Sequence, residues 1–289
     1  MPPTSLAPRR AVRAAGTYFT ELWSRREFAW YLAMGNLKAR NASTALGLLW
    51  WVLNPVLLGA VYWFVFGLLF ERSADEFGGL PFVVYLLSGM FPFYFTQTAM
   101  TGGVNSIVNN TQLLANLHFP RAVLPIAALV EGFVGFLTSL FAFFIIVGPA
   151  NGLVVGFDGA VWPTIDIVLL IPIMIIHLMF NLGLSMLVAR LAVPFRDLNN
   201  LVPYLTRMWL YLSPILYGPA TLAKAPDWAR AIANSNPMAP LLRLYRHALT
   251  PLDTDLSLAF TQAGIWALAL LVGGGLWFIR YEGRMARYL

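Results

Sequence analysis

The stretch NASTALGLLWWVLNPVLLGAVYWFVFGLLF, residues 41–70, contains no charged side chain. A transmembrane helix needs about 20 mostly apolar residues, so this stretch is long enough to cross a bilayer. The composition of the whole chain agrees, because 59% of its 289 residues are hydrophobic and 11% are charged. A soluble domain carries roughly 25% charged residues. The sequence therefore indicates an integral membrane protein.

The apolar stretch at residues 45–70 is followed by others of similar length and composition. They lie at residues 80–103, 122–148, 165–189, 198–217 and 258–279. None of them alternates apolar and polar residues over the ~10 positions that are typical of a β-barrel strand. We therefore expect an all-α membrane domain at residues 41–289 with six transmembrane helices.

The first 40 residues differ from this pattern. Residues 1–16 lack the apolar core of a signal peptide and predict a disordered, basic cytoplasmic tail. In residues 17–40 apolar side chains recur near helical spacing and charged ones lie elsewhere around the helix. This pattern favours an amphipathic helix in the membrane interface. A simple membrane anchor is the alternative interpretation.

Charge placement predicts the orientation. Most lysines and arginines fall in the N-terminal tail or in loops on the same side of the membrane, whereas most acids fall on the other side. By the positive-inside rule both termini lie in the cytoplasm. The external stretch at residues 218–257 is rich in proline and apolar, which favours short re-entrant or interfacial helices. One of these is predicted at residues 238–249, where Arg243, Arg246 and His247 share a helical face.

The chain lacks the residues that several kinds of chemistry require. The chain has no G-x-x-x-x-G-K-S/T phosphate loop, and its two lysines, Lys38 and Lys224, do not lie in glycine-rich loops, so we expect no ATP hydrolysis by this route. Cysteine is absent and the three histidines lie far apart, so no metal site is expected. The net charge of +6 clusters beside apolar segments, which indicates membrane contact rather than nucleic-acid binding.

Ionisable groups within the predicted spans are few. They are Glu131, His177 and Arg207, and such groups suggest a functional role because they are costly in a bilayer. Glu131 could bind a coupling ion in a secondary transporter. Alternatively, Glu131 and Arg207 pair with each other or with backbone groups.

Aromatic residues make up 15% of the chain and gather in the first, second and fifth predicted spans. Flat rings with a polar handle suit the apolar faces of sugars in a conduit, while interfacial belts and core packing are the alternatives for each of them. The conduit candidates are Trp50, Trp51, Tyr62, Phe91, Phe93, Tyr94, Tyr204, Trp209 and Tyr211.

The stretch LLANLHFPRAVLPIA, residues 113–127, lies on the cytoplasmic side between the second and third spans. Residues 109–111, Asn-Asn-Thr, can cap a short helix. That helix should run to about Phe119, since the residue before Pro120 disfavours helical geometry. Pro125 falls near the first turn of the next span, where proline is tolerated. The stretch thus predicts a stiff cytoplasmic element with Arg121 at its corner.

Here the sequence resembles a known family, the membrane subunits of type-2 ABC exporters for lipid-linked polysaccharides such as O-antigen, teichoic acid and galactan. FPRAVLP resembles the family's FPRE-x-LP signature. Four other stretches agree in order: STALGLLWWVLNPVL, PFRDLNNLVPYLTRMWLYLSPILY, NPMAPLLRLYRHAL and FIRYEGRMARYL. The matching segments are residues 119–125, 43–57, 194–217, 236–249 and 278–289.

The resemblance covers about residues 20–289, with one departure at Ala122, where the family often has an acid. It implies a homodimer in the bacterial cytoplasmic membrane that binds two copies of a separate ATPase subunit. That partner would hold ATP and Mg, and this chain would need no cofactor of its own. The substrate would be a polyprenyl-diphosphate-linked polysaccharide, with galactan and O-antigen as candidates.

The resemblance also implies roles for particular residues. Residues 109–121 would form the coupling helix on the ATPase, with a second contact at Arg196 and Asp197. The N-terminal interfacial helix would admit the diphosphate at the inner leaflet, and Arg243, Arg246 and His247 would belong to the external gate. The coupling residues are Asn116, His118, Phe119, Pro120, Arg121, Arg196 and Asp197; the diphosphate residues are Arg25, Arg26, Lys38 and Arg40.

Other functions remain open on the sequence alone. An ABC exporter of lipids or drugs would share the fold but need fewer sugar-stacking rings. A proton-coupled secondary transporter would depend on Glu131 or His177. A membrane-embedded enzyme would need a cluster of polar catalytic groups, which the sequence does not indicate, and a structural scaffold is the remaining alternative.

Overall fold

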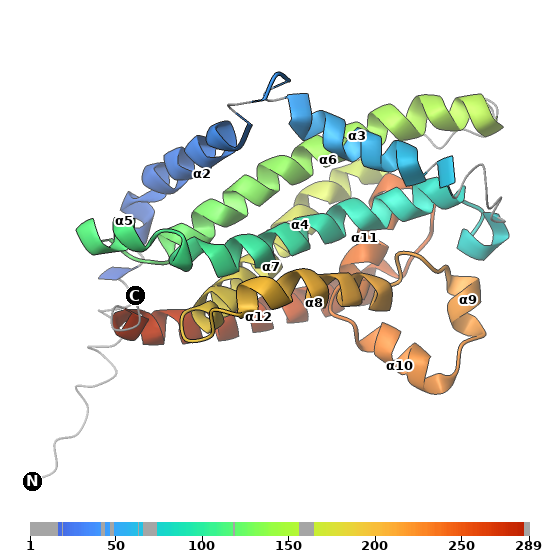
Figure 1. The fold of residues 1–289 in the computed structure, drawn as a ribbon. Coiled ribbons are helices and arrows are strands. Elements are labelled where there is room, and N and C mark those ends of the chain that lie inside the picture. Colours follow the sequence, from blue (N-terminus) through green and yellow to red (C-terminus); the bar gives the residue numbers. More distant parts are fainter. Residues whose placement is uncertain are drawn as a thin grey trace, which may run out of the picture.

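The computed structural model describes residues 17–18, 20–41, 44–46, 49–62, 64–65, 74–117, 119–155 and 165–285. Within these ranges the regular structure is helical throughout, as expected (Figure 1). The predicted tail at residues 1–16 and His118 lie outside the described residues. The helices are α2 (Arg26–Asn41), α3 (Trp50–Tyr62), α4 (Phe82–Val108), α5 (Thr111–Asn116), α6 (Val123–Val155), α7 (Leu170–Ala192), α8 (Leu198–Leu212), α9 (Pro219–Ala223), α10 (Asp227–Ser235), α11 (Ala239–Leu249) and α12 (Leu256–Met285), with 3-10 turns η3 (Ala74–Phe77) and η5 (Ile165–Leu169).

Among the described residues, 4 helical segments are long and apolar enough to cross a membrane. They contain α4, α6, α7 and α12, and they correspond to the second, third, fourth and sixth predicted spans. The segments are Asp75–Val108, Val123–Ile145, Ile165–Ala192 and Leu256–Glu282.

The first and fifth predicted spans are represented by shorter helices. α3 has 13 residues, and the rest of that apolar stretch lies mostly outside the described residues. α8 has 15 residues and ends at Leu212 because Ser213, which precedes Pro214, takes an extended conformation with ψ 146°. Membrane crossing at these two positions stays a prediction.

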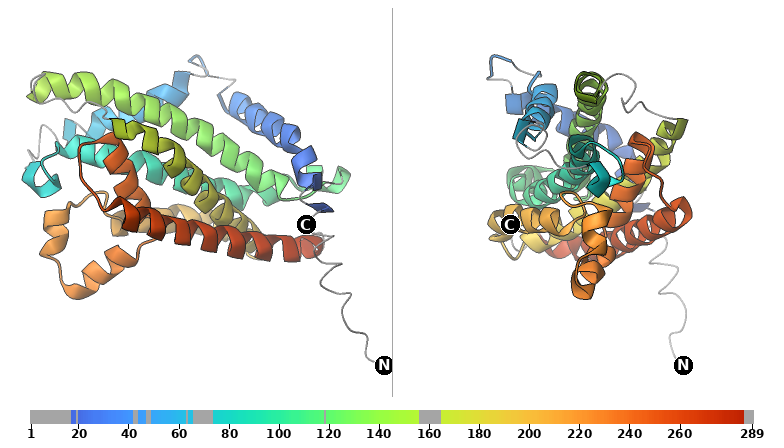
Figure 2. Two further views of the ribbon diagram at one scale, coloured as in Figure 1. Left: turned by 180° about the vertical axis from the view of Figure 1, so that it is seen from behind. Right: turned by 90° about the vertical axis from the view of Figure 1, so that its right-hand side faces the viewer.

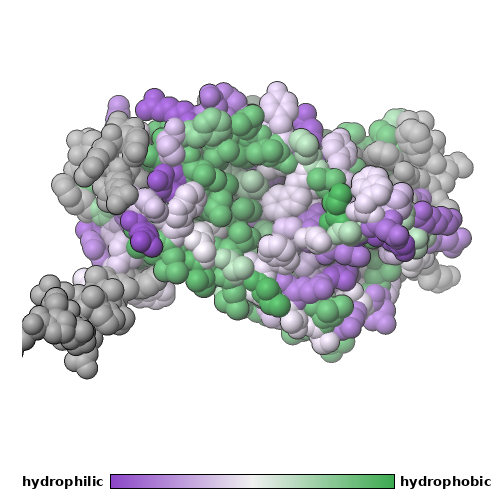
Figure 3. Space-filling view, turned by 90° about the horizontal axis from the view of Figure 1, so that it is seen from below, coloured by the Kyte–Doolittle hydropathy of each residue, from purple (hydrophilic) through white to green (hydrophobic). Residues whose placement is uncertain are grey.

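The four long helices run side by side along the length of the molecule in the left view of Figure 2, and the right view looks nearly along them. Of the 18-residue apolar stretch that makes α4 a candidate membrane span, 72% is buried inside the protein, whereas 17% of the corresponding stretch of α12 is buried. α4 is therefore the central helix of the bundle and α12 lies at its edge. Apolar residues dominate much of the face shown in Figure 3, and hydrophilic residues gather toward the end that carries α9 and α10.

The two ends of the bundle differ in what they carry. α5, the α7–α8 turn and the C-terminal end of α12 lie at one end, which we call the corner end (Figure 1). α9, α10 and η3 lie at the opposite end, which we call the distal end. The helix predicted at residues 238–249 is present as α11, and it packs inside the distal half of the bundle.

A buried polar cluster holds α11 against the long helices. His177 of α7 is hydrogen-bonded to Thr96 of α4 at 2.8 Å and to the Tyr245 hydroxyl of α11 at 3.1 Å. All three side chains are fully or almost fully buried. Since a buried polar group without a partner destabilises the fold, these contacts fix how the three helices meet, and the described structure accounts for one of the ionisable residues within the spans.

α7 and α12 pack with their backbones in contact. A Cβ atom added at Gly183 would lie 2.2 Å from the Leu270 carbonyl carbon, and one added at Gly274 would lie 2.2 Å from the Gly183 carbonyl oxygen. Small residues allow this close approach, which drives helix association in membranes through van der Waals packing. The pair of glycines therefore sets the distance between the two helices.

We expect Gly274→Ala to destabilise the protein, because its methyl group would push α12 away from α7. Overpacking of this kind costs about 1–3 kcal/mol. Gly273→Ala is the matched control, since nothing lies within 4 Å of a Cβ at that position. Thermal unfolding of the two purified variants should show a lower Tm for Gly274→Ala alone; equal Tm values would contradict this packing.

Candidate functional site

The segment between α5 and α6 forms a tight corner at residues 117–122, which we call the FPR corner. α5 ends at Asn116, earlier than the predicted Phe119, because Leu117 is already extended with ψ 138°. The Asn110 side chain donates to the Ser106 carbonyl at 2.9 Å and accepts no hydrogen bond from the first turn of α5, so the predicted side-chain cap is wrong. α6 begins at Val123, which places Pro125 in its first turn as expected.

Arg121 is bound to the end of α12. Its backbone N–H donates to the Glu282 carboxylate, and its guanidinium Nη1 donates to the Glu282 carbonyl at 2.9 Å. The same carboxylate accepts the Tyr18 hydroxyl at 2.6 Å. Burial and the Glu282 carboxylate raise the pKa of Tyr18 well above its usual value, so its hydroxyl stays a donor. One carboxylate thus joins three segments that are far apart in sequence.

The FPR corner also holds α2. The rings of Phe119 and Phe28 meet edge to face with their centroids 5.4 Å apart. Ala29 and Ala33 of α2 are buried in one apolar cluster with Val123 of α6. The predicted helix at residues 17–40 is largely present, but it is interrupted by a turn at Arg25 just before α2. The FPR corner is therefore in direct contact with α2.

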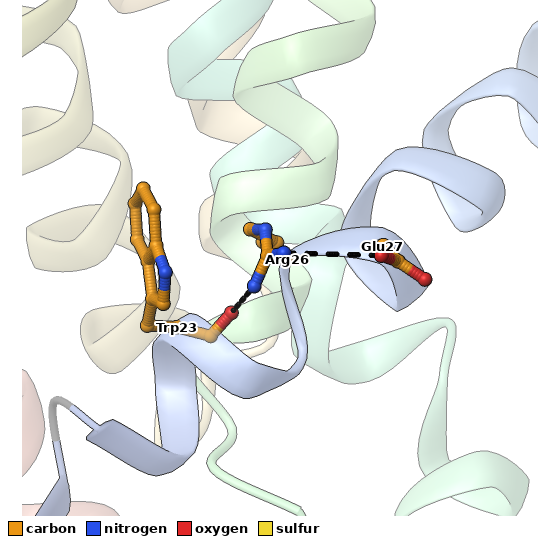
Figure 4. Close-up of polar contacts among 3 residues, drawn as sticks. All are labelled: Trp23, Arg26 and Glu27. Atoms are coloured by element: carbon orange, nitrogen blue, oxygen red, sulfur yellow. Dashed lines mark hydrogen bonds and ion pairs between the residues drawn. The ribbon is translucent and has the colours of Figure 1, made fainter.

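α2 and the turn before it also carry exposed cations and rings. Arg26 folds back on its own turn, as Figure 4 shows: its Nη1 donates to the Trp23 carbonyl at 3.2 Å, and its Nη2 lies 3.9 Å from the Glu27 carboxylate. The guanidinium carbon lies 5.3 Å from the centroid of the Trp23 ring. Arg25 and Lys38 are exposed, and the Arg40 side chain lies outside the described residues.

A polar groove of about 760 Å³ runs between α2, α4 and α6. Gln97, Thr101, Asn105 and Asn109 line it from α4 at intervals of four residues, which places them on one face of that helix. Asn36 lines it from α2. Amides and hydroxyls both donate and accept hydrogen bonds, so the groove offers reciprocal partners to hydroxyl groups. The groove reaches the start of α5 and so opens at the corner end.

Glu131 of α6 lines this groove and also a second cavity of about 250 Å³ that extends toward α3. Tyr94 and Thr98 line both cavities, which are therefore neighbours along the α4–α6 interface. Arg207 lies on the exposed face of α8, and α8 packs on α4 and α7. Glu131 and Arg207 thus belong to different surfaces, which does not support the predicted pairing between them.

The conduit candidates occupy several environments. Phe93 and Trp209 pack edge to face at 5.7 Å, and the Trp209 indole donates to Asn236 at 2.9 Å, so both belong to the protomer's interior. Phe91 and Tyr94 line the second cavity. Tyr204 and Tyr211 are 66% and 60% exposed on α8. Trp50 is partly exposed, and the Trp51 and Tyr62 side chains lie outside the described residues. The conduit role stays a prediction.

The remaining coupling candidates lie around the FPR corner. Arg196 and Asp197 are exposed in the α7–α8 turn at the corner end, and Pro120 is buried. The Asn116 side chain, like the whole of His118, lies outside the described residues.

The three gate candidates of α11 have different partners. Arg246 is buried against Tyr85 of α4, with its guanidinium carbon 3.6 Å from the ring centroid. Arg243 donates to Gln262 of α12. His247 lies 3.0 Å from the Leu252 carbonyl. The two arginines line one distal cavity, and His247 instead holds the segment that follows α11.

Sequence reasoning missed two features of this region. Glu282 lies in one of the motifs identified in the sequence, but its contact with Arg121 was not predicted, because nothing in the spacing of residues 121 and 282 indicates contact. Sequence reasoning also passed over the polar stripe on α4, although amide residues at positions 97, 105 and 109 of an apolar helix are a signal that the sequence contains. Attention to four-residue spacing would have found the groove.

Comparison with known proteins now places the chain in a class. Residues 27–250 match the ABC-2 type transporter family, and the chain belongs to that family. It is similar to the O-antigen export system permease protein RfbA of Myxococcus xanthus, with 31% identity over 254 residues that cover 86% of this chain and 92% of the relative. A Klebsiella pneumoniae protein of the same name is 28% identical over 215 residues, or 73% of this chain and 75% of the relative. The resemblance found in the sequence is confirmed.

We expect Glu282→Ala to loosen the FPR corner, because it removes the carboxylate that accepts the Arg121 N–H. A hydrogen bond to a charged group is worth about 1.5–3 kcal/mol, so amide exchange at residues 121–124 should rise at least about tenfold. Tyr18→Phe, which removes one hydroxyl, should have a smaller effect. Glu27→Ala is the control, since that side chain is 75% exposed. Unchanged exchange in Glu282→Ala would show that the contact does not hold the corner.

Proposed function

We propose that this chain is the permease subunit of an ATP-driven exporter of a polyprenyl-diphosphate-linked polysaccharide of the O-antigen class. Two copies would span the bacterial cytoplasmic membrane, with both termini in the cytoplasm. Two copies of a separate ATPase subunit would bind ATP and Mg and supply the energy. Galactan is a second candidate within the same substrate class.

The polar groove is the observation that carries this proposal. An exporter of lipids or small apolar drugs has no need for a row of amides and hydroxyls along a central helix. Sugar hydroxyls pair with Gln97, Thr101 and Asn105 as both donors and acceptors. A groove of about 760 Å³ is also large enough for one or two sugar units rather than a single ion.

The exposed cations of α2 and its preceding turn support diphosphate binding beside this groove. Asn36 on one side of α2 lines the groove, while Arg25, Arg26 and Lys38 are exposed nearby. The exposed Arg26–Glu27 pair adds little stability, so Arg26 can exchange this contact for a phosphate, which guanidinium groups bind in a bidentate manner. The sugar would then enter the groove while the diphosphate stays at the interface.

The FPR corner supports coupling to an ATPase, but through residues other than the expected Arg121. Arg121 was the expected contact, but its guanidinium is already held by the Glu282 carbonyl. The surface available to a partner is α5 and Leu117, an apolar side chain that is 50% exposed. Arg196 and Asp197 offer a second contact at the same end. Within this proposal Arg121 transmits the movement to α12 instead of touching the ATPase.

The exposed face of α8 supports a homodimer. Met208 and Leu205 are 61% and 48% exposed there beside the two tyrosines named above. Arg207 shares this exposed surface, and a charge that faces lipid is costly. The face therefore suits a second copy of the chain around an aqueous path better than it suits bilayer hydrocarbon.

The dimer can be tested by cross-linking, because the natural chain has no cysteine. Met208→Cys should form a disulfide-linked dimer in membranes under mild oxidation. Ile175→Cys on α7 is the control, since Ile175 is 53% exposed but lies on a different helix. Equal cross-linking of the two variants, or none at Met208→Cys, would argue against α8 as the dimer contact.

The groove can be tested in lipid with the proposed ATPase partner. We expect lipid-linked glycan to stimulate ATP hydrolysis, and the Thr101→Val, Asn105→Leu double variant to weaken this stimulation at least about fivefold, since each hydrogen bond contributes roughly 0.5–1.5 kcal/mol. Thr261→Val makes the same chemical change on α12, where the hydroxyl bonds only to its own helix. Stimulation by phospholipid and not by glycan would instead favour a lipid exporter.

A further inference from the structure

A small cavity lies at the distal end, away from the groove. It has a volume of about 260 Å³ and is enclosed by the start of α4, the segment after α8, the end of α10 and α11. This volume is below the range of pockets that hold a whole drug-sized ligand, so it suits one small group. Its lining combines apolar residues with two arginines and several other polar side chains, and these polar residues are Tyr85, Asn234, Arg243, Arg246, Asp253 and Thr254.

Arg246 is built into the wall of this cavity. The residue is only 5% exposed, and its guanidinium stacks on the Tyr85 ring with 3.6 Å between the guanidinium carbon and the ring centroid. The Tyr85 hydroxyl is fixed in turn, since it donates to the Tyr217 carbonyl at 3.2 Å. Gly89 makes room for the cation, because a Cβ there would lie 2.8 Å from Nη2.

The charge of Arg246 is not balanced by the part of the chain that the structure describes. Its Nε and Nη2 atoms are buried without a hydrogen-bond partner there, as is the Nε atom of Arg243. Asp253 lines the cavity, but its residue is exposed and no ion pair joins it to either arginine among the described residues. A buried cation without a counter-charge is strongly destabilising, which indicates that an anion belongs here.

We propose that this cavity binds a phosphate group carried by a membrane lipid. Two guanidinium groups on one wall provide the planar, bidentate donors that suit phosphate oxygens, and Asn234 and Thr254 provide neutral hydrogen-bonding groups. The phosphate would come either from the headgroup of an anionic phospholipid or from the diphosphate of the polyprenol carrier. The site is separate from the groove, so it does not depend on sugar binding.

The experiment uses the full-length chain purified in detergent. Binding of phosphatidylglycerol and of phosphatidylcholine is counted by native mass spectrometry, and binding of radiolabelled inorganic diphosphate is measured at equilibrium. The variants are Arg246→Met, Arg243→Met and Gly89→Ala, which keeps both charges but displaces the Arg246 guanidinium. Arg230→Met is the matched control, since that arginine is exposed on α10 and paired with Asp227.

We expect phosphatidylglycerol, inorganic diphosphate or both to bind, and phosphatidylcholine to bind more weakly. Each of the three cavity variants should weaken that binding about tenfold or more, as loss of a charged hydrogen bond implies, while Arg230→Met should leave it unchanged. Phosphatidylglycerol alone would assign the site to phospholipid, and diphosphate would assign it to the carrier. If Arg246→Met does not fold, the other two variants decide. Binding of neither probe, or equal binding by all variants, would overturn the proposal.

Discussion

The Glu282 carboxylate is the contact on which the corner end of the molecule depends. It accepts the backbone N–H of Arg121 and the hydroxyl of Tyr18. Without it, the FPR corner would be tied to the end of α12 by the Arg121 guanidinium alone, apart from apolar packing, which is not directional. The hydrogen bonds give these three elements one relative position. A force applied at α5 therefore reaches both the last long helix and the segment that leads into α2.

The polar groove and the FPR corner share the helix α2. α2 rests on the corner through Phe28 and Phe119 and also supplies one wall of the groove through Asn36. Under the function proposed above, ATP-driven movement at α5 would shift α2 relative to α4 and so alternate the groove between binding and releasing sugar.

Much of the fold could be predicted from sequence because it follows from local properties. Apolar length predicted the four long helices, and the helix predicted at residues 238–249 corresponds to α11. The corner was found because two prolines restrict the backbone on both sides of Arg121. The partner of Arg121 could not be found, since residues 121 and 282 meet only through the packing of whole helices. The same limit applies to Arg246, whose burial depends on a glycine of α4 that sequence spacing does not connect to it.

Arg121 and Arg246, which lie at the two ends of the molecule, differ in whether their side chains have hydrogen-bond partners within the described structure. At the corner end, Glu282 and Arg121 are partly buried and are hydrogen-bonded to each other. At the distal end, Arg246 is more deeply buried and keeps two nitrogen atoms without partners in the described structure. A buried charge that is left unsatisfied persists only where function or a ligand compensates for the loss of stability. The hydrogen bonds of the corner end thus suit it to connect separate segments, and the unpartnered arginine of the distal end suits that end to bind an anion.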